Sequence, residues 1–239
     1  DDYAGKTVAG NTFDFAYTHG KSIMKAGSPF ISCSNERFCS DTTYRKAAWS
    51  LDLICGKQVT TVVGNDSLGT RFSIFPAEMQ NALTDFTAGG GNVLISGAYI
   101  GTDVWGQIYE YSIDKEAQAE TQKFVRNILG YKWVRGHGSR SGKVRYVTDG
   151  SIDSCDEGDF TFHNSINPDK YCVETPDGIS PSGKNSETIM RYSDTGISAA
   201  IGHQGDGYRT VCIGFPIETL KTEESIDTII STTLDFFTK

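Results

Sequence analysis

The 239-residue chain carries a formal net charge of −8, with 22 lysines and arginines against 30 aspartates and glutamates. Because phosphate backbones bind concentrated positive charge, this balance predicts no nucleic-acid partner. No apolar run approaches the roughly 18 residues of a membrane-spanning helix, and with 38% hydrophobic residues the chain can bury the core of a single large domain.

The first half of the sequence alternates short apolar runs with helical periodicity. Residues 29–33 are typical of a strand, and residues 40–51 of a helix capped by Ser40 or Asp41. A second strand is predicted over residues 53–55. A helix over residues 76–88 follows, with Pro at its start and three glycines after its end, and then a fully apolar strand over residues 93–95.

The second half contains the clearest amphipathic helix, over residues 114–129, which ends at a glycine. Residues 131–196 are rich in Gly, Ser, Asp and Asn and contain short strand-like pieces, so they predict a β-rich insertion. Strands follow over residues 197–201 and 210–214. The chain closes on a helix over residues 223–237, capped by the preceding threonine.

This alternation predicts an α/β fold: a doubly wound, mainly parallel sheet with helices on both faces, plus the β-rich insertion. We expect one domain, residues 1–239. The chain begins with Asp1-Asp2-Tyr3-Ala4, which has neither an initiating Met nor the features of a signal peptide. We therefore expect a mature piece of a longer polypeptide. Because polar and aromatic residues precede the first helix–strand unit, whereas a doubly wound domain usually opens on a strand, we also expect the first sheet strand upstream of Asp1.

The six cysteines are spread along the chain without a Cys-x-x-Cys pair, so a zinc knuckle is not expected. Cys55 and Cys212 lie in apolar runs and are expected to be buried as small hydrophobic side chains. Cys155 and Cys172 flank a polar insertion, where a disulfide would stabilise the loop. The sequence leaves open whether that bridge forms.

In open α/β sheets, ligands bind beyond the carboxyl ends of the strands. The polar side chains that follow the predicted strands are Ser34, Glu36, Lys57, Gln58, Tyr99, Asp103, His203 and Glu218. From this group we expect ligand contacts from Ser34, Glu36, Lys57, Gln58 and Tyr99.

The turn Gly97-Ala98-Tyr99-Ile100-Gly101 has the spacing of a nucleophile elbow, in which small neighbours allow a sharp strand-to-helix turn. The central residue is Tyr99, whose phenol is a poor nucleophile at neutral pH. Tyr99 is expected either to pack as part of a tight turn or to contact a ligand; covalent catalysis by its phenol is the third alternative.

Several segments together resemble the class I glutamine amidotransferase-like fold, and more closely the amidotransferase-like domain of secreted bacterial proteins labelled xanthan lyase-like. They are residues 13–21, 52–58, 75–80, 89–99 and 214–218. The resemblance implies a flavodoxin-like α/β domain and a secreted, periplasmic or cell-surface location. At the position of the family's Cys nucleophile stands Tyr99, and its His-Pro-Glu corresponds to Phe215-Pro216-Ile217-Glu218, which has no His. Glutamine hydrolysis by that mechanism is therefore not expected.

Two weaker patterns involve acidic residues and histidine. Asp149 and Asp153, together with nearby carboxylates, have spacing similar to a calcium loop but lack its central Gly and final Glu, so a solvated acidic loop is the alternative. His19 is a candidate for catalysis or for a structural role. No cofactor is expected.

We interpret the chain as an accessory or ligand-binding domain of a larger secreted protein, with a poly- or oligosaccharide and neighbouring domains of the same polypeptide as partners. One alternative is a hydrolase with Asp103, Glu218 or His19 as acid or base and Ser34 or Lys57 positioning the substrate. The other is a structural spacer, which an exposed apolar patch near Asp1 would favour.

Overall fold

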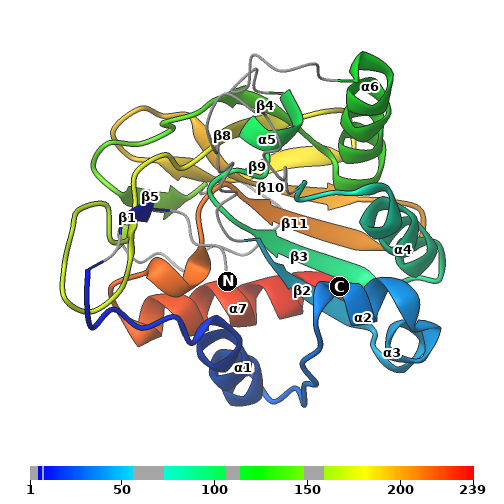
Figure 1. Ribbon diagram of the computed structural model, residues 1–239, viewed down its shortest axis with the longest axis horizontal. Helices are drawn as coiled ribbons and strands as arrows, with labels where there is room; N and C mark the ends of the chain where they lie inside the picture. The colour runs from blue at the N-terminus through cyan, green and yellow to red at the C-terminus, as the bar shows by residue number, and fades with distance from the viewer. Residues whose placement is uncertain (1–4, 7, 56–72, 106–113, 148–158) are drawn as a thin grey trace, which may run out of the picture.

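The computed structural model describes residues 5–6, 8–55, 73–105, 114–147 and 159–239 (Figure 1). The helices are α1 (Phe15–Lys25), α2 (Asn35–Ser40), α3 (Thr42–Ala47), α4 (Ala77–Ala88), α5 (Thr102–Trp105), α6 (Lys115–Phe124), the π-helix η1 (Val125–Leu129), the 3₁₀ turn η2 (Ile217–Thr219) and α7 (Glu223–Thr238). The strands are β1 (Gly5–Lys6), β2 (Ser50–Ile54), β3 (Asn92–Ser96), β4 (Tyr131–Arg135), β5 (Lys143–Tyr146), β6 (Phe160–Thr161), β7 (Cys172–Val173), β8 (Gly178–Pro181), β9 (Ser186–Tyr192), β10 (Ser198–Gln204) and β11 (Arg209–Ile213).

The main sheet has the strand order β2-β3-β11-β10-β9-β5-β6, and its two halves differ in strand direction. β2, β3 and β11 run parallel to one another. From β11 to β6 each neighbouring pair is antiparallel. The fold is therefore α/β with a mixed sheet, as the alternating sequence pattern predicts in its broad outline; the doubly wound connection remains a prediction.

Helices cover both faces of this sheet, as expected. Successive side chains of a strand point to opposite faces, and β3 shows this clearly. Leu94 packs in one core cluster with residues of α7 and β11, whereas Val93 and Ile95 pack in a second cluster with residues of α4 and α6. Figure 1 shows α1 and α7 together on one side of the sheet, and α4 and α6 on the other.

Three of the predicted helices form, with Gly130, Thr222 and Pro76 at their ends as the sequence suggested, and with a cap at Asp114 that the sequence analysis did not name. The Asp114 side chain caps α6 by accepting from the backbone N–H groups of residues 116 and 117. α6 continues into η1, and Gly130 ends it in the left-handed conformation with φ 81°. Thr222 caps α7 through the N–H of Ser225. α4 begins directly after Pro76.

The predictions for residues 29–33 and 40–51 are wrong. Residues 29–33 form no strand. In place of one helix over 40–51 there are α2 and α3, because the extended Asp41 ends the first and caps the second by accepting from the N–H of Thr43. The chain is extended again by Ala48, and Ser50 already belongs to β2.

The predicted insertion, residues 131–196, is rich in strands as expected. β4 and β8 pair with each other in a separate two-stranded sheet. β5 and β9 pair in the main sheet instead, where β9 lies against β10. This segment therefore extends the sheet and brings residues of the β7–β8 region over the carboxyl end of β3, where the elbow-like turn lies.

Candidate functional site

The turn after β3 needs both of its glycines. A Cβ on Gly97 would lie 2.2 Å from the backbone oxygen of Cys55, and one on Gly101 would lie 2.7 Å from the Trp133 ring. The N–H of Gly97 donates to the oxygen of Ile213 at 3.1 Å, which holds the turn against β11. The glycine spacing thus marks a sharp turn packed closely against neighbouring strands.

Tyr99, at the centre of this turn, is half-buried and packs against the core cluster on the α7 face of the sheet. Its phenol oxygen accepts a hydrogen bond from the Thr175 hydroxyl, in the segment between β7 and β8. The structure therefore places Tyr99 in a polar contact with its own chain at the position where an elbow presents its nucleophile.

Two backbone donors at the end of the turn, the N–H groups of Gly101 and Thr102, are occupied by a carboxylate that the sequence did not single out. Asp177 is fully buried, and its Oδ2 accepts from the N–H groups of Gly101 and Thr102, each at 2.7 Å. Its Oδ1 accepts from the Thr102 hydroxyl and, at 3.2 Å, from Trp133 Nε1. Burial raises the pKa of the Asp177 carboxyl to about 7, although the four hydrogen bonds act to lower it.

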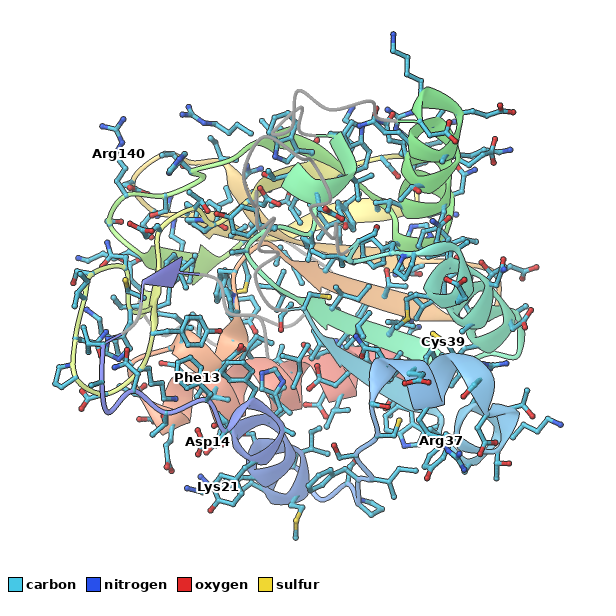
Figure 2. The ribbon with its side chains drawn as sticks, viewed as in Figure 1. Phe13, Asp14, Lys21, Arg37, Cys39 and Arg140 are labelled. Carbon is cyan, nitrogen blue, oxygen red and sulfur yellow. The ribbon has the colours of Figure 1, made fainter. Side chains whose placement is uncertain are left out.

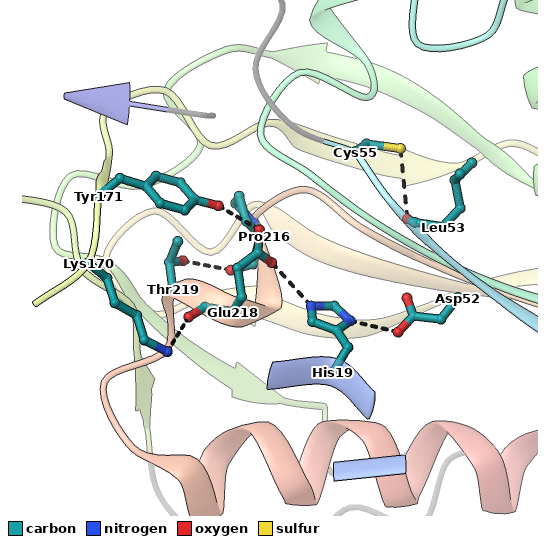
Figure 3. A network of polar contacts seen from close by, with 9 residues as sticks. All are labelled: His19, Asp52, Leu53, Cys55, Lys170, Tyr171, Pro216, Glu218 and Thr219. Atoms are coloured by element: carbon teal, nitrogen blue, oxygen red, sulfur yellow. Dashed lines mark hydrogen bonds and ion pairs between the residues drawn. The ribbon is translucent and has the colours of Figure 1, made fainter. Parts of the chain in front are cut away.

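A second buried cluster joins α1, β2 and η2 (Figure 3). His19 Nδ1 lies 2.6 Å from Asp52 Oδ2, and His19 Nε2 lies 3.2 Å from Glu218 Oε2. His19 and Glu218 are each only 2% exposed. Burial lowers the pKa of His19, but Asp52 and then Glu218 raise it, and the net value is about 10. His19 is therefore an imidazolium that donates to a carboxylate on each side.

Glu218 is held from two further directions. Tyr171 donates its hydroxyl to Glu218 Oε1 at 2.6 Å, and Lys170 Nζ donates to the Glu218 backbone oxygen at 2.7 Å. Both carboxylate oxygens of Glu218 and both ring nitrogens of His19 therefore have partners within the protein. Asp52 Oδ1 is the buried oxygen of this cluster that has no hydrogen-bond partner in the described chain.

The structure thus brings together two of the predicted acid–base candidates, His19 and Glu218, and adds Asp52 and Tyr171 to them. Asp52 could have been suspected from the sequence, because it lies inside the apolar run of residues 51–54 and buried carboxylates are rare unless they are paired. Tyr171 and Asp177 had no comparable signal.

The third acid–base candidate, Asp103, has different partners: its Oδ2 accepts from the N–H of Ile74 at 3.0 Å. Ser34 accepts from the N–H of Arg37 as the cap of α2, and Glu36 is exposed in the first turn of that helix. His203 contacts the Ser186 hydroxyl at 2.9 Å.

Several candidates lie outside the described residues: Lys57, Gln58, Asp149, Asp153 and Cys155. The Cys155–Cys172 bridge and the calcium loop therefore remain predictions. Cys55 and Cys212 are buried, as predicted. In the part of the chain that the structure describes, no group of three or more His, Cys, Asp or Glu side chains is arranged to hold a metal ion. No helix there has both the length and the apolar character needed to cross a bilayer.

Comparisons with known proteins show the fold of the chain, but they do not show its activity or its ligand. No protein-family model and no curated protein matches the sequence. A Thermoplasma acidophilum protein assigned to GMP synthase has a similar structure, with a TM-score of 0.51 at 11% identity over 96% of this chain and 93% of that one. An exo-β-1,4-mannosidase from Opitutaceae bacterium strain TAV5 aligns with a TM-score of 0.47 at 10% identity, over 98% of this chain and 33% of that one. The similarity to the Thermoplasma acidophilum protein gives the chain an amidotransferase-like α/β fold, as the resemblance implied.

Proposed function

We propose that this chain is a non-catalytic accessory domain, built on the amidotransferase-like fold, that binds a ligand within a larger secreted protein of polysaccharide handling. The observation that supports this proposal most directly is that side chains of the protein itself occupy polar groups at the turn after β3. The Asp177 carboxylate occupies the N–H groups of Gly101 and Thr102, and Thr175 donates to the Tyr99 phenol. Acyl transfer needs a nucleophile and free donors for the developing oxyanion. Here Tyr99 stands in place of the nucleophile, and the chain's own carboxylate occupies two N–H groups at the end of the turn, close to that position.

Ammonia release from glutamine is the first test of this proposal. We expect none from the wild-type protein. We also expect none from Tyr99→Cys, because a thiol at this position still has Asp177 on the adjacent donors and no histidine in the segment of residues 215–218. Ammonia release by the wild type that Tyr99→Phe abolishes would overturn the proposal.

The saccharide class of the ligand follows from the sequence resemblance. It is tested by calorimetric titration with acidic and neutral oligosaccharides, comparing the wild type with Tyr99→Phe. Saccharide binding that weakens in Tyr99→Phe supports a ligand at the turn. Absence of binding to every member of both panels contradicts the saccharide proposal, and the ammonia assay is unaffected by that outcome.

A hydrolase with a reorganised site is the second candidate, because His19 and Glu218 do converge within hydrogen-bonding distance. Against it stands the pairing inside the cluster. General acid–base catalysis needs a group that reaches substrate and whose pKa lies near the working pH. With a pKa near 10 and both nitrogens engaged, His19 is suited to holding carboxylates together. Hydrolysis of a glycoside or ester panel that is lost in Glu218→Gln, with folding retained, would favour this candidate.

The spacer alternative has one observation in its favour. Phe13, Tyr17 and Met24 are exposed apolar side chains on or just before α1. The alternative calls for an exposed apolar patch near Asp1, which lies outside the described residues, so it remains a prediction. Replacing all three by serine tests it: a spacer role predicts a weaker association with neighbouring domains of the parent protein, and unchanged association contradicts it.

A further inference from the structure

The edge of the main sheet at β2 presents unpaired backbone. β2 pairs with β3 in parallel register. The N–H of Asn92 donates to the oxygen of Trp49, and the N–H of Cys55 donates to the oxygen of Ser96. In such a ladder alternate residues face the same neighbour, so the odd-numbered residues from 49 to 55 bond to β3. The even-numbered residues direct their N–H and C=O groups to the opposite side.

Those outward groups belong to Ser50, Asp52 and Ile54. No backbone hydrogen bond to any of the three occurs on that side in the described chain. Three N–H and three C=O groups in a row form a template for another strand, and proteins normally cover such an edge.

A cavity of about 450 Å³ lies along this edge. Its lining comes from both layers of helices, not from one. Ile230, Leu234 and Phe237 line it from α7, which covers one face of the sheet. Phe38 of α2 and Phe86 of α4 line it from the other face. Both helical layers therefore continue past β2, and the space between them lies where the next strand of the sheet would be.

The segment of residues 28–35, between α1 and α2, forms a further part of the cavity wall, beside residues of α1 and residues 44–49. Figure 2 shows Lys21 on α1 and Arg37 on α2, the helices at the two ends of this segment. It includes residues 29–33, for which a strand was predicted. Its apolar side chains do not fill the cavity, since Phe30 is 42% and Ile31 is 62% exposed. No strand pairing connects this segment to β2.

We propose that the edge of β2 is a docking slot for one additional β-strand, supplied by a partner polypeptide that presents about five consecutive apolar residues in extended conformation. An extended backbone is the partner that offers alternating donors and acceptors to Ser50, Asp52 and Ile54. Because apolar helices cover both faces, the strand has apolar residues at consecutive positions instead of alternating ones. At roughly 3.3 Å per residue, pairing along β2 takes about five residues. This slot is independent of the function proposed for the turn after β3.

Titration with a synthetic peptide tests the slot. The probe carries five consecutive Val, Ile and Leu residues between flanking lysines, and its matched control has Asp at the third apolar position. The protein variants are Ile54→Pro, which removes one outward N–H and leaves the bonds to β3, and Ile54→Val, which keeps that N–H. We expect binding of the probe, binding weaker by about tenfold with Ile54→Pro, and no change with Ile54→Val.

Amide hydrogen exchange gives a second readout that does not depend on a variant. We expect the amides of Ser50, Asp52 and Ile54 to exchange rapidly in the free protein and to become protected when the probe binds. Absence of binding with rapid exchange overturns the proposal. Slow exchange in the free protein also overturns it, because the protein's own chain then covers the edge. A dimer in light scattering that protects these amides assigns the slot to a second copy and overturns it as well.

Discussion

The turn after β3 and the edge of β2 are neighbouring parts of the sheet, but they differ in whether their polar groups have hydrogen-bond partners. At the turn, the amides of Gly101 and Thr102 and the Tyr99 phenol have partners from the chain itself. At the edge, a row of backbone groups has none among the described residues. A motif recognised by its spacing can therefore be closed by distant residues, while an open surface can arise where no motif is visible.

Removing the carboxylate that closes the turn should have the largest effect. Asp177→Ala leaves two buried N–H groups and the Thr102 hydroxyl without their acceptor, whereas the Trp133 indole N–H keeps Thr102 Oγ1 at 3.0 Å. We expect a loss of about 4 kcal/mol in the free energy of unfolding, measured by urea denaturation. Asp206→Ala, at an exposed position, is the control and should change little. A loss below about 1 kcal/mol for Asp177→Ala would show that the turn is not held by this carboxylate.

The His19 cluster should make stability depend on pH. The pKa of His19 is raised from 6.5 to about 10 in the folded protein. Its stabilising contribution is therefore complete below pH 6.5 and is lost as pH rises toward 10, with a slope of up to about 1.4 kcal/mol per pH unit. The difference between wild type and His19→Gln isolates this slope from other groups.

The same pKa can be measured without a variant. The imidazole resonances of His19 should stay at their protonated positions from pH 5 to pH 8, since this range lies below the folded pKa of about 10. Titration of His19 near pH 6.5 would show that Asp52 and Glu218 do not hold it charged.

Gly97→Ala tests the tight packing under the turn. A Cβ there would lie 2.2 Å from the Cys55 oxygen, so β2 and β3 must separate to accept it. We expect a loss of about 2 kcal/mol, measured by thermal unfolding. Gly183→Ala is a matched control because no atom lies within 4 Å of its added Cβ. Equal stability of the two variants would contradict the close approach of the turn to β2.

Tyr99→Phe should have the smallest effect. It removes the oxygen that accepts from Thr175 and leaves the ring in its place. We expect a loss of about 1 kcal/mol in urea denaturation. Thr175→Val removes the donor of the same bond, and the double variant should be less destabilised than the sum of the two. Additive losses would mean that the two hydroxyls do not interact.

The helices could be predicted where local chemistry determines them. The threonine cap of α7 and the glycine that ends the helical segment of α6 and η1 were predicted from a few neighbouring residues. The strand predicted for residues 29–33 failed for a physical reason. Its composition favours an extended chain, but composition does not determine strand pairing. In the structure the segment lies across the cavity from the edge of β2 and does not pair with it.

Individual residues of the candidate site could be predicted from the sequence, but their contacts with one another could not. His19 and Glu218 were each suspected from sequence, but their contact spans 199 positions and no local pattern reports it. Asp177 and Tyr171 come from the strand-rich segment of residues 131–196. Their partners follow from how that segment folds over the sheet, which composition does not reveal.

The sequence separations within the His19 cluster also bear on the order of folding. His19 meets Asp52 across 33 positions and Glu218 across 199. Closing so long a loop costs chain entropy before any contact compensates for it. We expect the ion cluster to be absent from the folding transition state, so substitutions in it should accelerate unfolding and leave the folding rate nearly unchanged. The imidazolium between its two carboxylates would then form after the sheet and slow the unfolding of the folded protein.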